Sequence, residues 1–588
     1  MTPKKSVAKS LCIVVCFVIL SSLLVLFVGC TKGKSKARPS PAHRAALSKP
    51  APKLADEPMF DQDFPQLKRI PVPIERHEPI EAEEEPVLEL EDGPSKSKGW
   101  NKATPWATQA PPPAHGGTTP PNDEAEDAMF FENYGVNPFV DTEDDHFSTF
   151  AIDVDTASYT LSRGYLQRGN VPPKDAVRTE EFINYFDYGY ESPTEDMFGI
   201  NIEGAPSKFG KNCQLLRVGL KGYNVEPEQR KRAILTFVID VSGSMNRENR
   251  LGLVKKSLRL LVDELKEDDL IGIAIYGSRG QVYMPHMGLK DKTEILLAID
   301  RLVAQGSTYA EEGLRKGYEM ASSVYQEGSI NRIILCSDGV ANVGRTGADG
   351  ILEVIKSYKE KGITLSALGF GMGNFNDVLL EKLGDKGNGH YAYVDNISEA
   401  KRVFVENLTG TLQVIARDVK IQLDFNSEVV RSYRLLGYEN RAVADNKFRD
   451  DKEDGGEVGS GHSVTALYEV KFWPEKEGKL GTIYIRYKID DTKEVEEVNR
   501  EITKADFKAS FDETSTNFRL AATVAEFAEI LKKSYWAKES KLKDVLSFAQ
   551  TVLNEKKDDA AVIELVDLIS KANQHDEKMA EAKEPKKK

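Results

Sequence analysis

The stretch that decides the fold is "AILTFVIDVSGSMNRENR", residues 233–250. It begins with seven residues that are apolar apart from one threonine, which is typical of a strand buried on both faces of a parallel sheet. The run ends in Asp240, Ser242 and Ser244, with one residue between each. The sequence therefore places three oxygen-bearing side chains at the end of a buried strand, and a site built on them has to be considered.

Strand-like and helix-like segments alternate around this stretch, from residue 231 to about 410. The strand-like runs are Ala233–Ile239, Leu270–Tyr276, Arg332–Cys336, Ile363–Gly369 and His390–Val394. Between them lie segments with helical periodicity, and the apolar residues of the first, between Leu251 and Leu265, fall on one face. This alternation predicts an α/β fold with a doubly wound, mostly parallel sheet that helices cover on both faces.

At 588 residues the chain is too long for one compact core, so several domains are expected. Residues 31–128 hold 17 of the 27 prolines and few aliphatic side chains, which predicts a disordered tether. The later part includes strand-like runs after residue 411 and a helical stripe after residue 515. The predicted segments are a signal peptide (1–30), the tether (31–128), an N-terminal segment (129–230), the α/β domain (231–410), a small β domain (411–504), a helical segment (505–572) and a charged tail (573–588).

Composition and motifs exclude several functional classes. The net charge of −14 argues against a nucleic-acid-binding surface. The eight histidines are scattered, and no P-loop lysine or G-x-S-x-G nucleophile motif is present. Cys213 and Cys336 fall in different predicted segments and are expected to be buried thiols. We therefore expect a protein that is not an enzyme.

The N-terminus predicts attachment to a membrane. Three lysines precede an apolar stretch that ends in "LFVGC", with Cys30 as its last residue. This ending resembles a bacterial lipobox, so Cys30 is expected to become the lipid-modified first residue of the mature chain. The alternative is an uncleaved transmembrane anchor. Both place the protein in the cell envelope. In many Gram-negative lipoproteins an aspartate directly after the lipid-modified cysteine retains the protein at the inner membrane. Thr31 stands at that position here, which favours the outer membrane.

Polar side chains also follow other strands of the predicted sheet. Asp338 comes after the strand that ends at Cys336, and Thr308 lies just before a predicted helix. Because these loops open at one sheet edge, they would meet Asp240, Ser242 and Ser244 there. Two carboxylates and three hydroxyls suit Mg²⁺, Mn²⁺ or Ca²⁺. Taken singly, the same residues are also explained by helix caps and a turn.

The five side chains together resemble the metal-ion-dependent adhesion site of von Willebrand factor type A domains. That resemblance implies hydroxyl ligands from Ser242, Ser244 and Thr308. It also implies that Asp240 and Asp338 bind the metal largely through water. One coordination position would stay open for a carboxylate of a partner protein, with Mg²⁺ as the preferred ion.

The resemblance extends from about residue 130 to 570. "STFAIDVDTASY" and "VPPKDAVRTEEFINYFDY" before the domain, and "IARDVKIQLDFNSEVVRSYRLLGYENRAVADNKFRDD" after it, resemble the bacterial YfbK-like von Willebrand type A lipoproteins. This implies a membrane-tethered module that recognises a protein partner in adhesion or assembly.

Two alternative functions remain at this point. One is a structural or assembly protein whose metal site is not functional. The other is a phosphatase, because Asp153 and Asp155 resemble the D-x-D opening of haloacid-dehalogenase phosphatases, although Ala157 stands where that family has Thr or Val. A simpler interpretation is that Asp155 or Thr156 caps the helix "ASYTLSRGYL".

Overall fold

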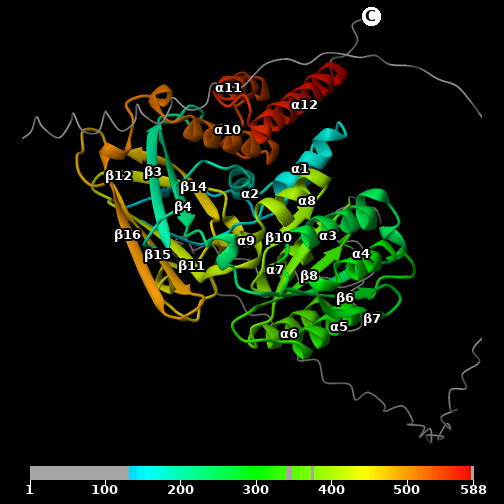
Figure 1. The fold of residues 1–588 in the computed structure, drawn as a ribbon. Coiled ribbons are helices and arrows are strands. Elements are labelled where there is room, and N and C mark those ends of the chain that lie inside the picture. The colour runs from blue at the N-terminus through cyan, green and yellow to red at the C-terminus, as the bar shows by residue number, and fades with distance from the viewer. Residues whose placement is uncertain (1–130, 340–346, 372–375, 584–588) are drawn as a thin grey trace, which may run out of the picture. The chain divides into compact units, whose positions relative to one another are not determined.

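The computed structural model describes residues 131–339, 347–371 and 376–583 (Figure 1). Contacts divide the chain after Pro105, and every described residue belongs to the second unit. The predicted signal peptide with Cys30 and the predicted tether lie outside the described residues. Among the helices of the described residues, none has both the length and the apolar character needed to cross a bilayer.

The quoted stretch forms the central strand of a six-stranded sheet. Strand β5 (Ala233–Asp240) is buried along its whole length, in the sheet order β10-β9-β8-β5-β6-β7. The other strands are β6 (Leu270–Tyr276), β7 (Gly280–Gly288), β8 (Ile330–Ser337), β9 (Thr364–Phe370) and β10 (Tyr391–Val394). All neighbours are parallel except β7, which runs antiparallel to β6 and was not predicted. Pro285 interrupts the strand pattern of β7, which suits an edge position.

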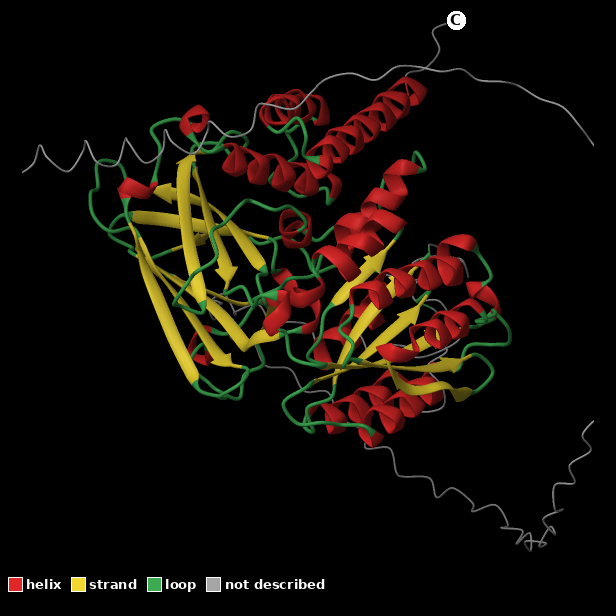
Figure 2. Cartoon of the chain, viewed as in Figure 1, coloured by secondary structure: helices red, strands yellow, loops and turns green. Residues whose placement is uncertain are grey.

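Helices cover both faces of this sheet, as the fold class predicts (Figure 2). One core contains side chains of α3 (Leu253–Glu264) and α4 (Lys292–Asp300). The opposite core contains side chains of α5 (Ala310–Ser323), α6 (Gly347–Lys359) and α7 (Asp377–Lys386). Helix α1 (Ala157–Gln167) from the N-terminal segment adds Ala157 and Leu161 to this second core. The short helices α8 (Ile397–Lys401) and α9 (Leu408–Leu412) complete the domain.

Strands that precede the α/β domain in the sequence and strands that follow it together form a β-sandwich. One sheet has the order β1-β12-β14-β4-β3, and the other has β13-β11-β15-β16 with β2 beside β11. Before the domain come β1 (Val140–Asp141), β2 (Phe147–Ala151), β3 (Phe198–Pro206) and β4 (Gln214–Gly222). After it come β11 (Val414–Phe425), β12 (Val430–Leu436), β13 (Gly456–Gly459), β14 (Ser463–Phe472), β15 (Gly481–Ile489) and β16 (Val495–Ile502).

The α/β domain is thus inserted in the sequence of the sandwich. Strand β4 pairs with β14, so that Val218 lies opposite Ala466. Side chains of both sheets share one apolar core. The sequence analysis treated residues 129–230 and 411–504 separately, because alternation along a strand does not identify its partner. The strand pairing joins the two segments in one sandwich. The predicted boundaries of the domains stay predictions.

Three C-terminal helices form a further core with the N-terminal segment. These are α10 (Thr516–Leu531), α11 (Leu542–Glu555) and α12 (Ala560–Lys583). The predicted apolar stripe of α10 is buried against α2 (Thr179–Asn184) and α11.

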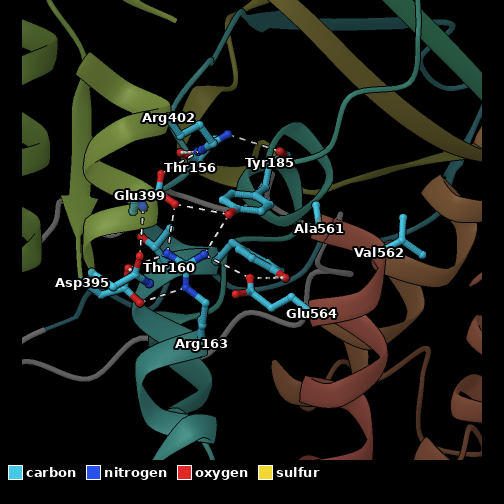
Figure 3. A network of polar contacts seen from close by, with 12 residues as sticks. Thr156, Thr160, Arg163, Tyr185, Asp395, Glu399, Arg402, Ala561, Val562 and Glu564 are labelled. Atoms are coloured by element: carbon cyan, nitrogen blue, oxygen red, sulfur yellow. Dashed lines mark hydrogen bonds and ion pairs between the residues drawn. The ribbon is translucent and has the colours of Figure 1, made fainter. Parts of the chain in front are cut away.

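Arg163 connects three parts of the molecule (Figure 3). It lies in α1, and its side chain is 2% exposed. Its guanidinium donates to Asp395 after β10 (Nε to Oδ2, 2.8 Å) and to Glu399 in α8 (2.9 Å). It also donates to Glu564 in α12 (3.0 Å). One buried cation therefore holds the N-terminal segment, the α/β domain and the C-terminal helices together.

Two more buried arginines work in the same way. Arg178, just before α2, donates to Asp377 at the start of α7 (2.7 Å). Arg441, after β12, donates to Asp153 (3.1 Å) and to Asp385 at the end of α7 (2.8 Å). Each contact bridges the α/β domain and the surrounding segments, or two of those segments.

We expect the Arg163→Ala variant to lose about 3–5 kcal/mol of unfolding free energy, because the buried Asp395 carboxylate would lose its guanidinium, while Glu399 would keep only Arg402 as a cationic partner. Chemical denaturation at pH 7 measures this loss. Arg168→Ala is the matched control, since this exposed arginine of the same region donates only to the backbone oxygen of Gly164 among the described residues. Similar losses in both variants would contradict the role assigned to Arg163.

Glu180 is buried without a counter-ion in direct contact. Its side chain is fully buried in α2, and neither carboxyl oxygen has a hydrogen-bond partner among the described residues. Burial, with repulsion from the nearby Glu439 carboxylate adding to it, raises the pKa of Glu180 to about 7, although Lys532 opposes the rise. The folded protein therefore keeps a proton on Glu180 at pH values where the unfolded chain has released it.

This predicts a pH-dependent cost that Glu180→Gln removes. The folded pKa lies above the ordinary value of 4.5, so the native chain loses stability as the pH rises from about 4.5 through about 7. At pH 8 the loss would be on the order of 3 kcal/mol, at about 1.4 kcal/mol per pKa unit. Denaturant titrations at pH 5 and pH 8 should show the variant gaining on the native chain at the higher pH. A constant difference between the two proteins would show that Glu180 does not titrate in this range.

Candidate metal centre

Asp240 ends β5 with its carboxylate held on both oxygens. The Ser242 backbone N–H donates to Oδ1 (2.8 Å), and the Ser337 hydroxyl donates to Oδ2 (3.2 Å). The Tyr276 hydroxyl, at the end of the neighbouring strand β6, lies near this carboxylate and lowers its pKa. Asp240 is fully buried. Three adjacent strands therefore fix its position at the carboxyl edge of the sheet.

The two serines of the motif face each other. Their hydroxyl oxygens are 2.9 Å apart, with Ser242 buried and Ser244 half-buried in the turn Gly243–Met245. This turn is separate from α3, which has Gly252 at its N-cap position, so the alternative that Ser244 caps that helix is wrong. The hydroxyls instead form a pair beside Asp240.

Asp338 follows β8, which pairs with β5 in parallel register. It is fully buried, and its carboxylate lies close enough to affect the titration of Asp240. Burial raises the pKa of Asp240 to about 6, and repulsion from Asp338 adds to this rise. The structure therefore brings together the two predicted carboxylates, as the parallel strands require.

The loop that carries Thr308 lies beside the β5 loop. Gly243 donates its backbone N–H to the Gly306 oxygen (3.0 Å), and Gln305 donates to the Val241 oxygen (2.5 Å). Thr308 itself is half-buried, two residues before α5. Among the described residues, no hydrogen bond joins its side chain to the other four. The structure thus places the Thr308 loop beside the β5 loop, and the Thr308 hydroxyl makes no described hydrogen bond to the other four side chains.

Arg250 is a residue of this edge that the sequence analysis missed. Its Nη1 donates to Asp338 Oδ2 (2.5 Å) and to the Ser244 backbone oxygen (2.8 Å). Its side chain is 6% exposed. Gly371 makes room for it, since a Cβ there would lie 2.4 Å from Arg250 Cγ. The available signal was an arginine at the end of the quoted stretch, directly before the helical stripe that begins at Leu251.

The donor set fits a hard cation. Oxygen atoms from carboxylates and hydroxyls gather at this edge, and hard divalent ions prefer such ligands. In the described part of the chain, no group of three or more His, Cys, Asp or Glu side chains could hold a metal. Arg250 already supplies one positive charge to Asp338, so an ion here would share that carboxylate with the guanidinium.

The second acidic pair does not form part of this edge. Asp153 accepts the Asp155 backbone N–H on one oxygen (2.9 Å) and Arg441 on the other (3.1 Å). Asp155 accepts the backbone N–H of Tyr391 (2.9 Å). Both carboxylates are buried, and neither caps α1, because Thr156 is its N-cap residue and makes no side-chain cap hydrogen bond. The prediction is right in placing Thr156 at the N-cap position but wrong in expecting a capping side chain there, and both aspartates anchor segments.

Comparison with known proteins assigns the chain to a family. Residues 235–410 match the von Willebrand factor type A domain, and residues 410–575 match the family described as "Uncharacterized protein YfbK, C-terminal". Residues 125–217 match a family described as von Willebrand factor. The chain is 32% identical over 452 residues to YfbK of Escherichia coli (strain K12), covering 72% of this chain and 78% of the relative. The chain belongs to the YfbK-like von Willebrand factor type A proteins.

Other relatives share shorter regions with this YfbK-like chain. The protein sll0103 of Synechocystis is 30% identical over 34% of this chain and 46% of its own length. Mouse inter-alpha-trypsin inhibitor heavy chain H3 is 29% identical over 26% of this chain and 18% of its own length. A solved von Willebrand factor type A structure from Catenulispora acidiphila covers 63% of this chain and 89% of its own, with 14% identity and a TM-score of 0.39.

The family models and the YfbK relative confirm the predicted YfbK-like von Willebrand factor type A family, and the mostly parallel sheet confirms the α/β class. Lipid attachment stays a prediction. The YfbK-like chain carries a protein-interaction module of the von Willebrand factor type A kind. Members of this domain family are generally adhesion or interaction modules and not enzymes.

We expect Arg250→Gln to destabilise the protein in metal-free buffer by about 3–5 kcal/mol, because it leaves the buried Asp338 carboxylate without its guanidinium. Unfolding in EDTA measures this effect. Arg259→Gln is the control. Arg259 lies in α3 and pairs with Asp300 at the surface, where such pairs contribute only about 0.2–1 kcal/mol. Equal stability of the native and Arg250→Gln proteins would show that Asp338 needs no internal cation.

Proposed function

We propose that this chain is a membrane-tethered recognition protein that binds a protein partner through a divalent cation. The observation that carries the proposal is the cluster of Asp240, Ser242, Ser244 and Asp338 at one edge of a sheet. The family assignment supports a protein partner. The oxygen-only donor set supports the cation.

The hydroxyls of Ser242, Ser244 and Thr308 would hold the cation directly, with Asp240 and Asp338 acting largely through water. Mg²⁺ is the preferred ion, and Mn²⁺ or Ca²⁺ are alternatives. When bound, the cation would supply a Lewis-acid position for a carboxylate of the partner.

The protein's own residues prepare this edge. Ser337 and the Ser242 backbone fix the Asp240 carboxylate before any ion arrives. Arg250 offsets the charge of Asp338, which reduces repulsion between two carboxylates buried close together. The Asp240 carboxylate and the described main chain around it are therefore held in place in advance, and binding a cation would require little rearrangement of them.

Attachment to the cell envelope completes the proposal. Cys30 would carry a lipid, and residues 31–128 would form a flexible connection between the membrane and the described domains. The outer membrane is favoured over the inner one. The partner would present an acidic side chain, and residues of the surrounding loops would provide specificity.

A second candidate is an assembly protein in which no metal is needed. The Arg250–Asp338 ion pair favours it, because the guanidinium already neutralises one of the two carboxylates. A phosphatase function is not supported by the geometry, since Asp153 and Asp155 are buried and their oxygens accept hydrogen bonds from Arg441 and the backbone.

The proposal predicts that divalent cations raise the melting temperature of the full chain above its value in EDTA. Binding to the native state alone stabilises by about 2.7 kcal/mol at a hundredfold excess over Kd. Thermal unfolding with Mg²⁺, Mn²⁺ or Ca²⁺ measures this gain. Asp240→Asn should abolish it, because the amide removes a negative charge from the site while keeping the side-chain shape.

Asp263→Asn is the matched control. Asp263 lies on α3, is 60% exposed and pairs with Lys292 at the surface, so this variant should keep the full metal response. A partner that binds equally well with and without a chelator would favour the assembly function. The absence of a metal response in the native chain would refute the cation-dependent function.

A further inference from the structure

Three aromatic rings meet on the surface, away from the proposed metal centre. They belong to Phe139, Tyr535 and Trp536, which we call the aromatic patch. The centroids of Phe139 and Trp536 are 5.0 Å apart, and those of Tyr535 and Trp536 are 5.1 Å apart, both in edge-to-face geometry. Tyr535 is 63% exposed and Trp536 is 40% exposed. Exposed large aromatic side chains that contact one another mark an interaction surface more strongly than scattered ones.

The patch is presented by a fixed loop. Residues 532–541 connect α10 to α11, and Ser534 in this loop is 1% exposed. The backbone N–H of Ser534 donates to the Glu529 oxygen (2.9 Å), and the Trp536 indole N–H donates to the Asn137 oxygen (3.1 Å). These hydrogen bonds join the loop to the end of α10 and to the segment before β1. The rings are therefore held outward by ordered main chain.

Arg434 fixes Trp536 from beneath. Its guanidinium carbon lies 5.4 Å from the indole centroid, and the same side chain is buried in ion pairs with Glu469 and Glu529. A buried guanidinium under one face of the indole leaves the exposed part of the ring directed to solvent. A partner of the patch must therefore bind the rings in the orientation that the structure shows.

Lysines surround the rings. The Lys471 ammonium lies 3.8 Å from the Phe139 centroid, and the Lys538 ammonium lies 3.9 Å from the Tyr535 centroid. Lys533 is exposed in the same loop. Among the described residues, none of these three lysines forms an ion pair with a carboxylate. The loop's acidic residue, Glu539, is itself paired with Lys211.

Three lysines place positive charge beside the rings, although the whole chain carries a net charge of −14. A protein of that charge is repelled by an anionic surface in general, so only a local cluster of cations can bring it there. Tyrosine and tryptophan rings favour the boundary between lipid headgroups and acyl chains, where one end is apolar and the other is hydrated. Lysines near such a boundary are attracted to anionic headgroups.

We propose that the aromatic patch and its three lysines dock on an anionic lipid bilayer. Tyr535 and Trp536 enter the headgroup region, and Lys471, Lys533 and Lys538 contact the anionic headgroups. This contact is separate from the metal centre and from the proposed lipid at Cys30. It would turn the helical side of the described domains toward the membrane that the tether holds nearby.

The experiment uses the full chain reconstituted with lipid vesicles. Its N-terminal apolar stretch would hold it on any vesicle, so the readout must report on the patch itself. The difference in emission between the chain and its Trp536→Phe variant isolates Trp536 from the other three tryptophans. Vesicles contain brominated phosphatidylcholine alone or with about a third phosphatidylglycerol, and bromine quenches an indole that enters the bilayer.

We expect quenching and a blue shift of Trp536 emission in the anionic vesicles, and little change in the neutral ones. Each lysine near an anionic surface changes the ratio of docked to undocked protein about fivefold. Lys533→Ala combined with Lys538→Ala should therefore lower this ratio by roughly 25-fold, and high salt should act in the same direction. Unchanged melting temperatures would show that the variants stay folded, because both lysines are exposed.

Lys361→Ala is the matched control. Lys361 is exposed in the α/β domain and lies 4.9 Å from the Tyr358 ring centroid, so it repeats a lysine–tyrosine contact outside the patch. This variant should keep full quenching. Equal quenching in neutral and anionic vesicles, or quenching that ignores the two lysines, would overturn the proposal. A shift with polyglutamate but none with vesicles would also overturn it and assign the patch to an acidic protein segment.

Discussion

Buried arginines that reach carboxylates from distant parts of the chain hold this molecule in one arrangement. A guanidinium has a rigid fork of donors, so one side chain can serve carboxylates from several elements at once. Arg163 does this for the end of β10, for α8 and for α12. Because a carboxylate left alone in such surroundings is costly, each segment is stable only in place. The von Willebrand factor type A domain is therefore positioned by its flanking segments as well as by its own core.

The sheet and most of the candidate site could be predicted from local sequence. Strand β5 could be recognised because its run of apolar residues, Ala233–Ile239, is interrupted only by Thr236. Asp240 and Asp338 could be paired because both follow parallel strands of one sheet, whose carboxyl ends meet. Thr308 shows the limit of this logic, since strand order places its loop at the edge but leaves the direction of its hydroxyl open.

What could not be predicted depends on partners far away in the sequence. The local sequence around Asp153 and Asp155 is the same whether the two aspartates are catalytic or hold neighbouring segments in place. The deciding residue is Arg441, which lies 288 positions after Asp153. Strands β1, β2 and β4 pair with strands beyond residue 413, and alternation along a strand does not identify its neighbour. Arg250 escaped notice for a related reason, because its position one turn before α3 matters only through Asp338.

The insertion of the α/β domain into the β-sandwich has a consequence for biosynthesis. Strands β1 to β4 leave the ribosome first, yet β4 needs β14 and β2 needs β11. The inserted domain has its parallel strands within its own sequence, so it can complete its sheet while the earlier strands still wait. Until the later strands emerge, the first sandwich strands expose unpaired backbone groups that could pair with other chains. The order of synthesis thus makes the sandwich close after the domain inserted in it, and its first strands are vulnerable until then.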